Sequence, residues 1–400
     1  MKKKDSRNST ISKKNVLILD GDQRSALAAT RSLGRKGIKV TAASEKIPCL
    51  SSCSKYCFDS FAYPSPYENT GLFLSIIKKE SLRRKIDVIL PMTEITTLII
   101  LKNKELFPSI VPFADFPAFD KLTDKWKLFK MAQSLGIPCP RTWFLSPEDD
   151  IEKLREELKF PLVLKPYKSR IFHNGVWRST AVRYAYSWED LLELRHQFPF
   201  RSHKLLLQEK IGGTGQGVFA LYDRGNPIVF FAHRRIREKP PSGGVSVLRE
   251  SVPVDPTLKE TAKKILDEVE WHGVAMVEFK VTDEGMPFLM EVNARFWGSL
   301  QLAIDSGVDF PFLLYKLAIG EKVEDSISYK TNVKTRWLLG DLDHLYLSIF
   351  KRSSSCPPGY PGRLRCFIDF FNFFDRNFNF EVLKFADIRP FIFELQEYLK

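Results

Sequence analysis

The residues of this chain best suited to chemistry are two glutamates and an asparagine in its last third. Residues 274–281 and 287–293 are apolar, strand-like segments with a short Asp-Glu-Gly turn between them, a pattern that predicts a β-hairpin. Pairing of these segments makes Glu278 and Glu291 near cross-strand neighbours. Asn293 lies two residues after Glu291 and therefore on the same face of its strand. We expect the hairpin to gather two carboxylates and an amide oxygen.

This set of oxygens indicates a metal site. Carboxylates are costly to bury without partners, and Mg²⁺ is typically held by one or two carboxylates together with substrate phosphates. The alternative is a solvated strand face on which Arg295 forms an ion pair with the glutamates. The apolar neighbours Met276, Phe288 and Met290 indicate that both strands are substantially buried, and this favours the metal site.

Two lysines add the capacity to bind phosphate. Lys165 closes an apolar strand-like segment and is followed by Pro166, which places its ammonium group at a strand end. Lys125 lies in the first turn of a predicted helix, where a cation opposes the helix dipole; such a local cost often marks a functional position. Two lysines beside a magnesium–carboxylate site are suited to binding a triphosphate and to spreading its charge during phosphoryl transfer.

The composition is that of a folded protein with several domains. The chain has 400 residues, of which 44% are hydrophobic and 27% charged, and this excludes a disordered or collagen-like chain. No apolar run approaches the roughly 18 residues of a membrane-spanning helix. Residues 1–14 are basic and polar and lack the apolar core of a secretory signal, so we expect a cytoplasmic protein with a flexible basic tail.

Charge and cysteine content exclude two further classes. The net charge of +13 includes that tail, and the remaining excess forms no basic stripe interleaved with aromatic residues, so binding to nucleic acid is disfavoured. Cys49, Cys53 and Cys57 suggest an iron–sulfur cluster, but their spacing does not fit the radical-enzyme signature and no fourth ligand lies nearby. We therefore expect free thiols in a reducing compartment.

The N-terminal part has the pattern of a doubly wound α/β domain. Strand-like segments at 15–20, 38–42 and 87–91 alternate with helical spacing, first at 25–36. The turn after the first strand carries only one glycine, Gly21, instead of a GxGxxG motif, so NAD and FAD are disfavoured.

The middle of the chain indicates an α+β region with a largely antiparallel sheet. The expected strands are residues 161–165, 180–186, 205–210, 218–222, 228–233, 274–281 and 287–293, and the expected helices begin near residues 124, 188 and 256. Residues 212–217 are glycine-rich, but no GK[ST] follows them, so a turn is expected there and not a phosphate-binding loop. Residues 367–399 contain ten phenylalanines at helix-like spacing, which favours a helical unit packed on the body over a membrane-surface helix.

A second group of candidates is suited to binding a substrate. Arg235, Arg237 and Arg249 can bind carboxylates through two hydrogen bonds, and the small residues Ser242, Gly243 and Gly244 let backbone amides approach an anion. Strand alternation sends some of these arginines to solvent. Arg24 follows the first strand, at the end where open α/β sheets bind ligands, and Glu94 is a weaker candidate of the same kind.

With these motifs in place, the chain resembles the ATP-grasp superfamily of carboxylate–amine (or thiol) ligases. It is similar to the branch of carbamoyl phosphate synthase and biotin carboxylase, and to predicted ATP-dependent carboligases. The resemblance covers residues 15–325 and is most specific in TDKWKLFKMAQSLGIPCPRT, FPLVLKP, LLLQEKIGG and VEFK…FLMEVNARFWGS. It implies an α/β pre-ATP-grasp domain (15–118), a small lid subdomain (119–205), a large subdomain (206–330) and a helical C-terminal extension (331–400).

The resemblance also implies roles for individual residues. Lys125 and Lys165 would contact the ATP phosphates, and Arg295 would face the reacting group. The hinge beside adenine would consist of Gln208, Glu209, Lys210 and Ile211, with hydrogen bonds from Glu209 and Ile211. Glu278, Glu291 and Asn293 would hold Mg²⁺, with Mn²⁺ as an alternative ion. The loop after Lys165 lacks the glycines usual in the family, so closure over the phosphates falls to a residue among Lys168, Ser169, Ser179 and Thr180.

The activity implied is activation of a small carboxylate by ATP as an acyl phosphate and its transfer to an amine, with release of ADP and phosphate. The substrates would be a small-molecule carboxylic acid and an amine, and a homodimer is common in the family. Two alternatives stay open: a kinase-like enzyme that forms an acyl phosphate, and a non-catalytic ATP-binding or scaffold protein.

Overall fold

The computed structural model describes residues 14–324, 327–352, 356, 359–372 and 378–400. The expected flexible tail, apart from Lys14, lies outside these residues, as do two of the C-terminal phenylalanines. Within the described part of the chain, no helix is long and apolar enough to cross a membrane.

The N-terminal part forms a four-stranded parallel sheet in the order β3-β2-β1-β4, as expected for a doubly wound domain. Strand β3, which is short and lies at the sheet edge, was not predicted from the sequence. The elements are β1 (Val16–Ile18), α1 (Arg24–Arg35), β2 (Val40–Ser44), β3 (Asp59–Ala62), α2 (Thr70–Arg83), β4 (Val88–Leu90), α3 (Glu94–Lys102) and η1 (Lys104–Leu106).

Two helices connect this domain to a small antiparallel sheet with the order β5-β10-β6-β9. The elements are α4 (Phe116–Thr123), α5 (Lys125–Ser134), β5 (Thr142–Leu145), η2 (Ile151–Leu154), β6 (Leu162–Pro166), β7 (Arg170–His173), β8 (Val176–Ser179), β9 (Arg183–Ala185), α6 (Trp188–Arg195) and β10 (Leu205–Glu209). Because β10 pairs with β5 and β6, this sheet extends to Glu209, past the expected boundary at residue 205. Its apolar core is separate from that of the rest of the molecule.

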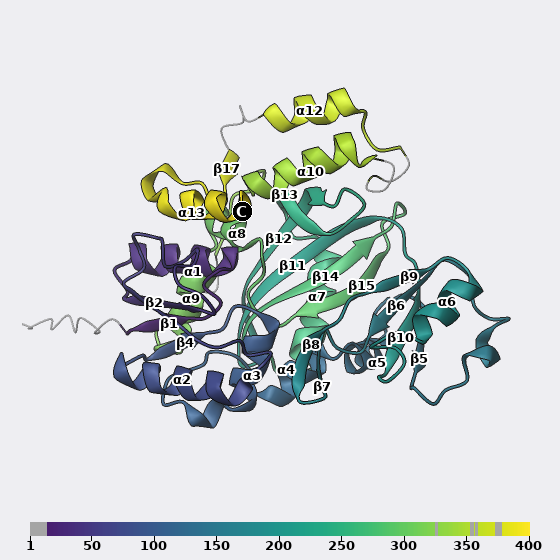
Figure 1. Cartoon of the computed structure of the whole chain (residues 1–400), viewed down its shortest axis with the longest axis horizontal. Helices are drawn as coiled ribbons and strands as arrows, with labels where there is room; N and C mark the ends of the chain where they lie inside the picture. Colours follow the sequence, from purple (N-terminus) through teal and green to yellow (C-terminus); the bar gives the residue numbers. More distant parts are fainter. Residues whose placement is uncertain (1–13, 325–326, 353–355, 357–358, 373–377) are drawn as a thin grey trace, which may run out of the picture.

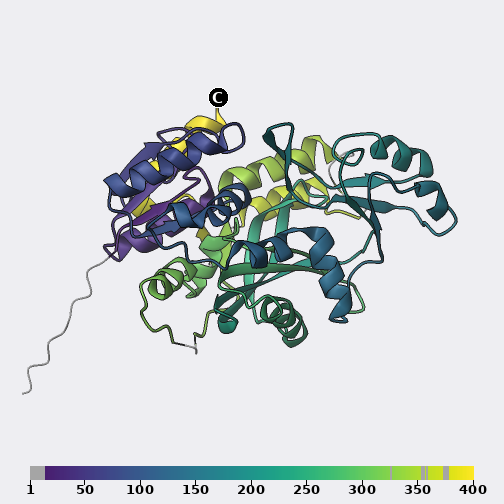
Figure 2. The ribbon, with the colours of Figure 1, turned by 90° about the horizontal axis from the view of Figure 1, so that it is seen from below.

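The largest sheet has seven strands in the order β15-β14-β11-β12-β13-β16-β17. Its elements up to residue 318 are β11 (Thr214–Asp223), β12 (Asn226–Lys239), β13 (Val245–Val252), α7 (Pro256–Asp267), β14 (Gly273–Val281), β15 (Pro287–Asn293), α8 (Leu300–Ser306) and α9 (Phe310–Ala318). The turn expected at residues 212–217 is shorter than predicted, because Thr214–Gly217 already pair with β14. The small and N-terminal sheets lie at opposite ends of the long axis, with the large sheet between them (Figure 2).

The C-terminal part is helical, as expected, but it also completes the large sheet. Its elements are β16 (Lys334–Arg336), α10 (Leu338–Phe350), α12 (Arg363–Phe371), β17 (Phe378–Phe380), η3 (Phe385–Asp387) and α13 (Arg389–Tyr398). Strand β16 pairs with β13, and β17 pairs with β16. Helices α10 and α12 lie over the large sheet, while α13 lies beside α1 of the N-terminal domain (Figure 1). The segment therefore bridges two domains.

The environment of a carboxylate in this C-terminal segment leads to a prediction about the pH dependence of stability. Glu394 of α13 accepts a hydrogen bond from Trp337 Nε1 at 2.8 Å, and burial raises the pKa of Glu394 to about 7. Between pH 4.5 and 7 the folded state therefore binds more protons than the unfolded state, so the contribution of Glu394 to stability is lost as the pH rises through 7. Glu394→Gln should remove this loss. The free energy of unfolding of the variant minus that of the wild type should therefore be larger at pH 8 than at pH 5, by about 1–3 kcal/mol. Urea unfolding at the two pH values measures it.

The matched control is Glu397→Gln on the same helix, where the carboxylate is half exposed and pairs with Lys400. An identical pH dependence of unfolding for Glu394→Gln and the wild type would contradict the prediction.

Candidate functional site

The predicted hairpin and its carboxylate pair are confirmed by the structure. Strands β14 and β15 pair so that Glu278 and Glu291 lie directly opposite each other, with a bulge immediately after Glu278. The Asn293 amide nitrogen lies 3.2 Å from Glu278 Oε1 and 3.3 Å from Glu291 Oε1. The neighbouring side chains of Val277 and Val292 are buried and hold the opposite face of the hairpin in the core. We call Glu278, Glu291 and Asn293 the carboxylate site.

Two arginines contact the carboxylate site, one from strand β12 and one from the segment that follows β15. Arg235 of β12 donates to Glu278 Oε2 at 2.9 Å and to Glu238 Oε1 at 2.8 Å. Arg295 donates to Asn293 Oδ1 at 3.0 Å. Burial and the neighbouring Glu291 nevertheless raise the pKa of Glu278. Burial and the facing Glu291 thus outweigh the opposing effect of Arg235 and Arg295 on Glu278.

The two predicted phosphate lysines converge on Glu291 from two other elements. Asp124 caps the N-terminus of α5 through the Lys127 amide, which places Lys125 at the first helical position. Lys125 Nζ lies 3.9 Å from Glu291 Oε2 and donates to Ser169 Oγ at 2.9 Å. Lys165, near the end of β6, donates to the Met290 carbonyl at 3.4 Å. Both lysines are more than nine-tenths buried.

The pKa values follow from this convergence. Burial lowers the pKa of Lys165 to about 8, with a further decrease from Lys125 and an opposing effect of Glu291. Burial acts to raise the pKa of Glu291, but Lys125, Lys165 and Asn293 outweigh it, so the net pKa of Glu291 is lowered. Perturbed pKa values in a cluster of facing titratable groups are typical of functional sites.

The predicted hinge residues lie where the small sheet meets the large one. Gln208 is buried in β10, donates to Thr142 Oγ1 at 2.9 Å, and leaves its Oε1 without a hydrogen-bond partner in the described structure. Lys280 donates to the Ile211 carbonyl at 3.2 Å. Lys210 lies beside a cleft of about 1350 Å³ between the two sheets, lined also by Tyr184 and Tyr186. We call it the hinge cleft.

The segment after Lys165 forms the two-stranded hairpin β7–β8. Of the four residues considered for closure, Ser169 contacts Lys125, whereas Lys168 pairs with Asp120 at 2.5 Å. Thr180 donates to the Lys168 carbonyl at 2.7 Å, and Ser179 lies at the end of β8. Of these four residues, the structure thus brings Ser169 to Lys125.

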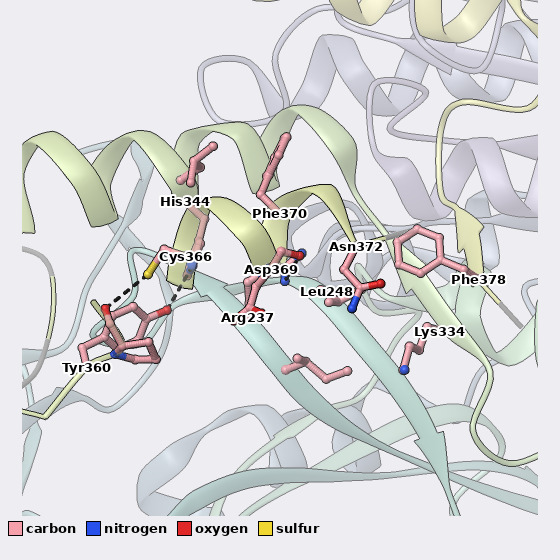
Figure 3. Close-up of a pocket in the computed structure, with 13 residues that line it drawn as sticks. Arg237, Leu248, Lys334, His344, Tyr360, Cys366, Asp369, Phe370, Asn372 and Phe378 are labelled. Atoms are coloured by element: carbon pink, nitrogen blue, oxygen red, sulfur yellow. Dashed lines mark hydrogen bonds between the residues drawn. The ribbon is translucent and has the colours of Figure 1, made fainter. Parts of the chain in front are cut away.

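The predicted substrate arginines are divided by a backbone irregularity. Pairing between β12 and β13 shifts register on both sides of Arg237. Arg235 consequently reaches Glu278, while Arg237 forms a double hydrogen bond with buried Asp341 of α10 at 2.6 and 2.7 Å. Arg237 lines a separate cavity of about 410 Å³ beneath α10 and α12, where Tyr360 and His344 are hydrogen-bonded (Figure 3).

The other substrate candidates lie around a cavity of about 250 Å³ at the carboxylate site, which we call the central cavity. Arg24, Arg249 and Gly244 line it together with Arg295. Ser242 and Gly243 lie in the β12–β13 turn and line the hinge cleft. At Gly244 a Cβ would lie 2.4 Å from the Lys239 carbonyl oxygen, so the tight turn requires glycine.

Two residues around the central cavity, Ser299 and Glu381, were not predicted as site candidates from the sequence. His233 and Ser299 line the cavity and are hydrogen-bonded to each other at 2.8 Å. Glu381 pairs with Arg24 at 2.7 Å and with Arg249 at 2.5 Å. No local signal marks Glu381, because its partners are distant in sequence. Glu94 lines a neighbouring cavity of about 520 Å³ that Arg24 and Arg295 also line.

The carboxylate site fits a divalent cation by its chemistry. It combines two carboxylates with an amide side chain, and the raised pKa of Glu278 indicates that a positive charge between the carboxylates would stabilise the ionised form. In the described residues no cluster of three or more His, Cys, Asp or Glu side chains forms a metal site, so a cation between these two carboxylates would need further ligands from other groups. Cys49, Cys53 and Cys57 are free thiols, and burial raises the pKa of each.

Comparisons with known proteins agree with this geometry. Residues 201–340 match the family described as "ATP-grasp in the biosynthetic pathway with Ter operon". The large chain of carbamoyl phosphate synthase from Pyrococcus furiosus is 26% identical over 188 residues, which are 44% of this chain but only 16% of that relative.

Among solved structures, the L-amino acid ligase of Bacillus licheniformis superposes with a TM-score of 0.63 at 17% identity, covering 80% of this chain and 78% of the ligase. The biotin carboxylase domain of Hydrogenobacter thermophilus 2-oxoglutarate carboxylase, solved with MgADP and bicarbonate, has the same TM-score and identity and covers 81% of this chain and 74% of that domain. The predicted resemblance is confirmed: the chain has the ATP-grasp fold.

Proposed function

We propose that this chain, which has the ATP-grasp fold, is an ATP- and Mg²⁺-dependent ligase that activates a small carboxylate as an acyl phosphate and transfers it to an amine. The observation that carries the proposal is the convergence of Lys125 and Lys165 on Glu291 from two separate elements. Structural ion pairs rarely combine two buried lysines with two opposed, partly exposed carboxylates, because the desolvation cost of the lysines is high. A bound triphosphate and a divalent cation would compensate these charges.

In this proposal each group has a defined task. Lys125 and Lys165 bind the phosphates of ATP and orient the γ-phosphoryl group. Glu278, Glu291 and Asn293 hold Mg²⁺, which when bound supplies positive charge to the phosphate oxygens. Gln208, Glu209, Lys210 and Ile211 bind adenine beside the hinge cleft. Arg295, which lines the central cavity, faces the substrate carboxylate.

The chemistry then proceeds in two displacements. A carboxylate oxygen of the substrate forms a bond to the γ-phosphorus as the bond to the bridging oxygen of ADP breaks. The amine nitrogen next attacks the acyl carbon, the carbon–oxygen bond to phosphate breaks, and the amine proton is lost to phosphate or solvent. Positioning and fixed charges supply the rate, so no covalent catalyst from the protein is required.

The test is ADP release from Mg-ATP by the purified protein, offered pools of amino acids, dipeptides and organic acids with and without amines. We expect ADP together with a product whose mass equals acid plus amine minus water. ADP with an acyl phosphate that persists in the presence of amines would favour the kinase-like alternative. Tight ATP binding without ADP from any pool would favour the non-catalytic alternative and overturn the proposal.

A further inference from the structure

Glu381, from the C-terminal segment, contacts two arginines that line the central cavity. It directly follows β17, the last strand of the large sheet, and its residue exposure is only 2%. Its Oε2 atom lies 2.7 Å from Arg24 Nη1 and 2.5 Å from Arg249 Nη2. One carboxylate thus binds two guanidinium groups that come from the N-terminal domain and from the large sheet.

Both arginines line the central cavity beside the carboxylate site. Arg249 is almost fully buried and also donates to the Ser246 carbonyl at 2.9 Å. Arg24 stacks over the Trp337 ring at 3.7 Å, and a Cβ on Gly298 would lie 3.7 Å from its Nη2 atom. Arg24 is therefore held on one edge by Glu381 and on one face by Trp337, both from the C-terminal part of the chain.

The charge balance explains why such an arrangement is needed. Four arginines and two glutamates line the central cavity: Arg24, Arg235, Arg249, Arg295, Glu278 and Glu291. Glu278 pairs with Arg235, and Glu291 pairs with Lys125. Without Glu381, Arg24 and Arg249 would be two buried guanidinium groups repelling each other. With it, their remaining N–H groups are held in fixed directions.

We propose that Glu381 is a positioning residue, which orients Arg24 and Arg249 to receive the anionic group of the carboxylate substrate. This inference rests on the proposed ligase function. The C-terminal segment then completes the active site, in addition to covering the large sheet. Recognition of a carboxylate by arginine depends on the orientation of the planar guanidinium group. Loss of the contacts that Glu381 makes with Arg24 and Arg249 should therefore weaken binding of the acid and leave ATP binding unchanged.

Asp387 provides a matched comparison within the same segment. It binds Arg31 Nε at 2.8 Å, Ser54 Oγ at 2.7 Å and the Lys55 amide at 2.9 Å, and so anchors the segment on the N-terminal domain. Neither Asp387 nor Arg31 lines the central cavity. A purely structural role for the segment would make Asp387→Asn and Glu381→Gln equivalent.

The experiment compares these two variants in the full-length protein, with the acid identified in the ligation assay. We expect Glu381→Gln to raise the KM for the acid about tenfold with the KM for ATP within about twofold. Asp387→Asn should lower thermal stability and leave both KM values near those of the wild type. Equal changes in both KM values, or the same kinetic profile for the two variants, would overturn the proposal.

A second measurement does not need activity. Glu381→Ala leaves room for a small carboxylate between the two arginines, so acetate should raise its melting temperature by about 3 °C more than chloride at equal ionic strength, an effect absent from the wild type. Equal melting temperatures of Glu381→Ala in acetate and in chloride would overturn the proposed positioning role of Glu381. Absence of ligation in the wild type would instead defeat the proposed function, and the two failures are thus distinguishable.

Discussion

Glu291→Gln should reduce Mg-ATP-dependent ADP release about 100- to 1000-fold while the protein stays folded. Glu291 lies opposite Glu278 and within 3.9 Å of Lys125, so its charge serves both the proposed cation and the phosphate lysines. The substitution keeps the shape and the hydrogen-bonding capacity of the side chain. It also removes the Glu291 charge, which in addition to burial raises the pKa of Glu278, so no large loss of stability is expected.

The measurement is initial ADP release as a function of Mg²⁺ concentration, with circular dichroism as the check on folding. Glu284→Gln is the control, because Glu284 lies in the turn of the same hairpin and is exposed. Turnover of folded Glu291→Gln at the wild-type rate would remove Glu291 from the metal site.

Lys165→Met should weaken ATP binding about 10- to 100-fold and at the same time stabilise the protein. Burial lowers the pKa of Lys165 to about 8, so holding the charged form at pH 7 costs the folded state free energy. Methionine fills a similar volume without a charge and should raise the free energy of unfolding at pH 7 by about 1–3 kcal/mol. Opposite changes in stability and affinity are expected where a buried charge is kept for a ligand.

Urea unfolding at pH 7 and calorimetric titration with ATP measure the two effects. Lys130→Met serves as the control, because Lys130 is an exposed lysine on α5. Unchanged ATP affinity in Lys165→Met would contradict a phosphate-binding role, and a loss of stability would contradict the desolvation argument.

The same lysine links ATP binding to pH. Because the folded pKa of Lys165 is lowered, part of the protein has a neutral Lys165 near pH 8, and bound phosphate favours the protonated form. ATP binding at pH 8 should therefore take up a fraction of a proton, and the affinity should fall as the pH rises above 8. Titrations in buffers of different ionisation enthalpy detect the uptake, which Lys165→Arg should abolish while binding is retained.

Local rules explain which parts of the site the sequence could predict. The hairpin turn and the alternation of side chains place Glu278, Glu291 and Asn293 together, because all three lie within one supersecondary unit. Asp124 caps α5, which fixes Lys125 at the helix start for an equally local reason. The roles predicted for the remaining site residues came from the resemblance to ATP-grasp motifs.

The same rules failed where the backbone departs from regularity. Alternation places Arg235 and Arg237 on one strand face, but the register shifts around Arg237 separate them. One consequently binds Glu278 and the other binds Asp341. Strands β16 and β17, each three residues long, were likewise missed because a strand so short is defined mainly by its neighbour.

The sequence by itself determined the N-terminal α/β pattern, the β14–β15 hairpin and its carboxylates, since these depend on contacts between residues close along the chain. Only the tertiary structure decided that Lys125 and Lys165 face Glu291, and that Glu381 binds Arg24 and Arg249. Such contacts join segments distant in sequence, and they are fixed by the packing of whole sheets and helices. A charged residue carries no local signal of the partner that packing will bring to it.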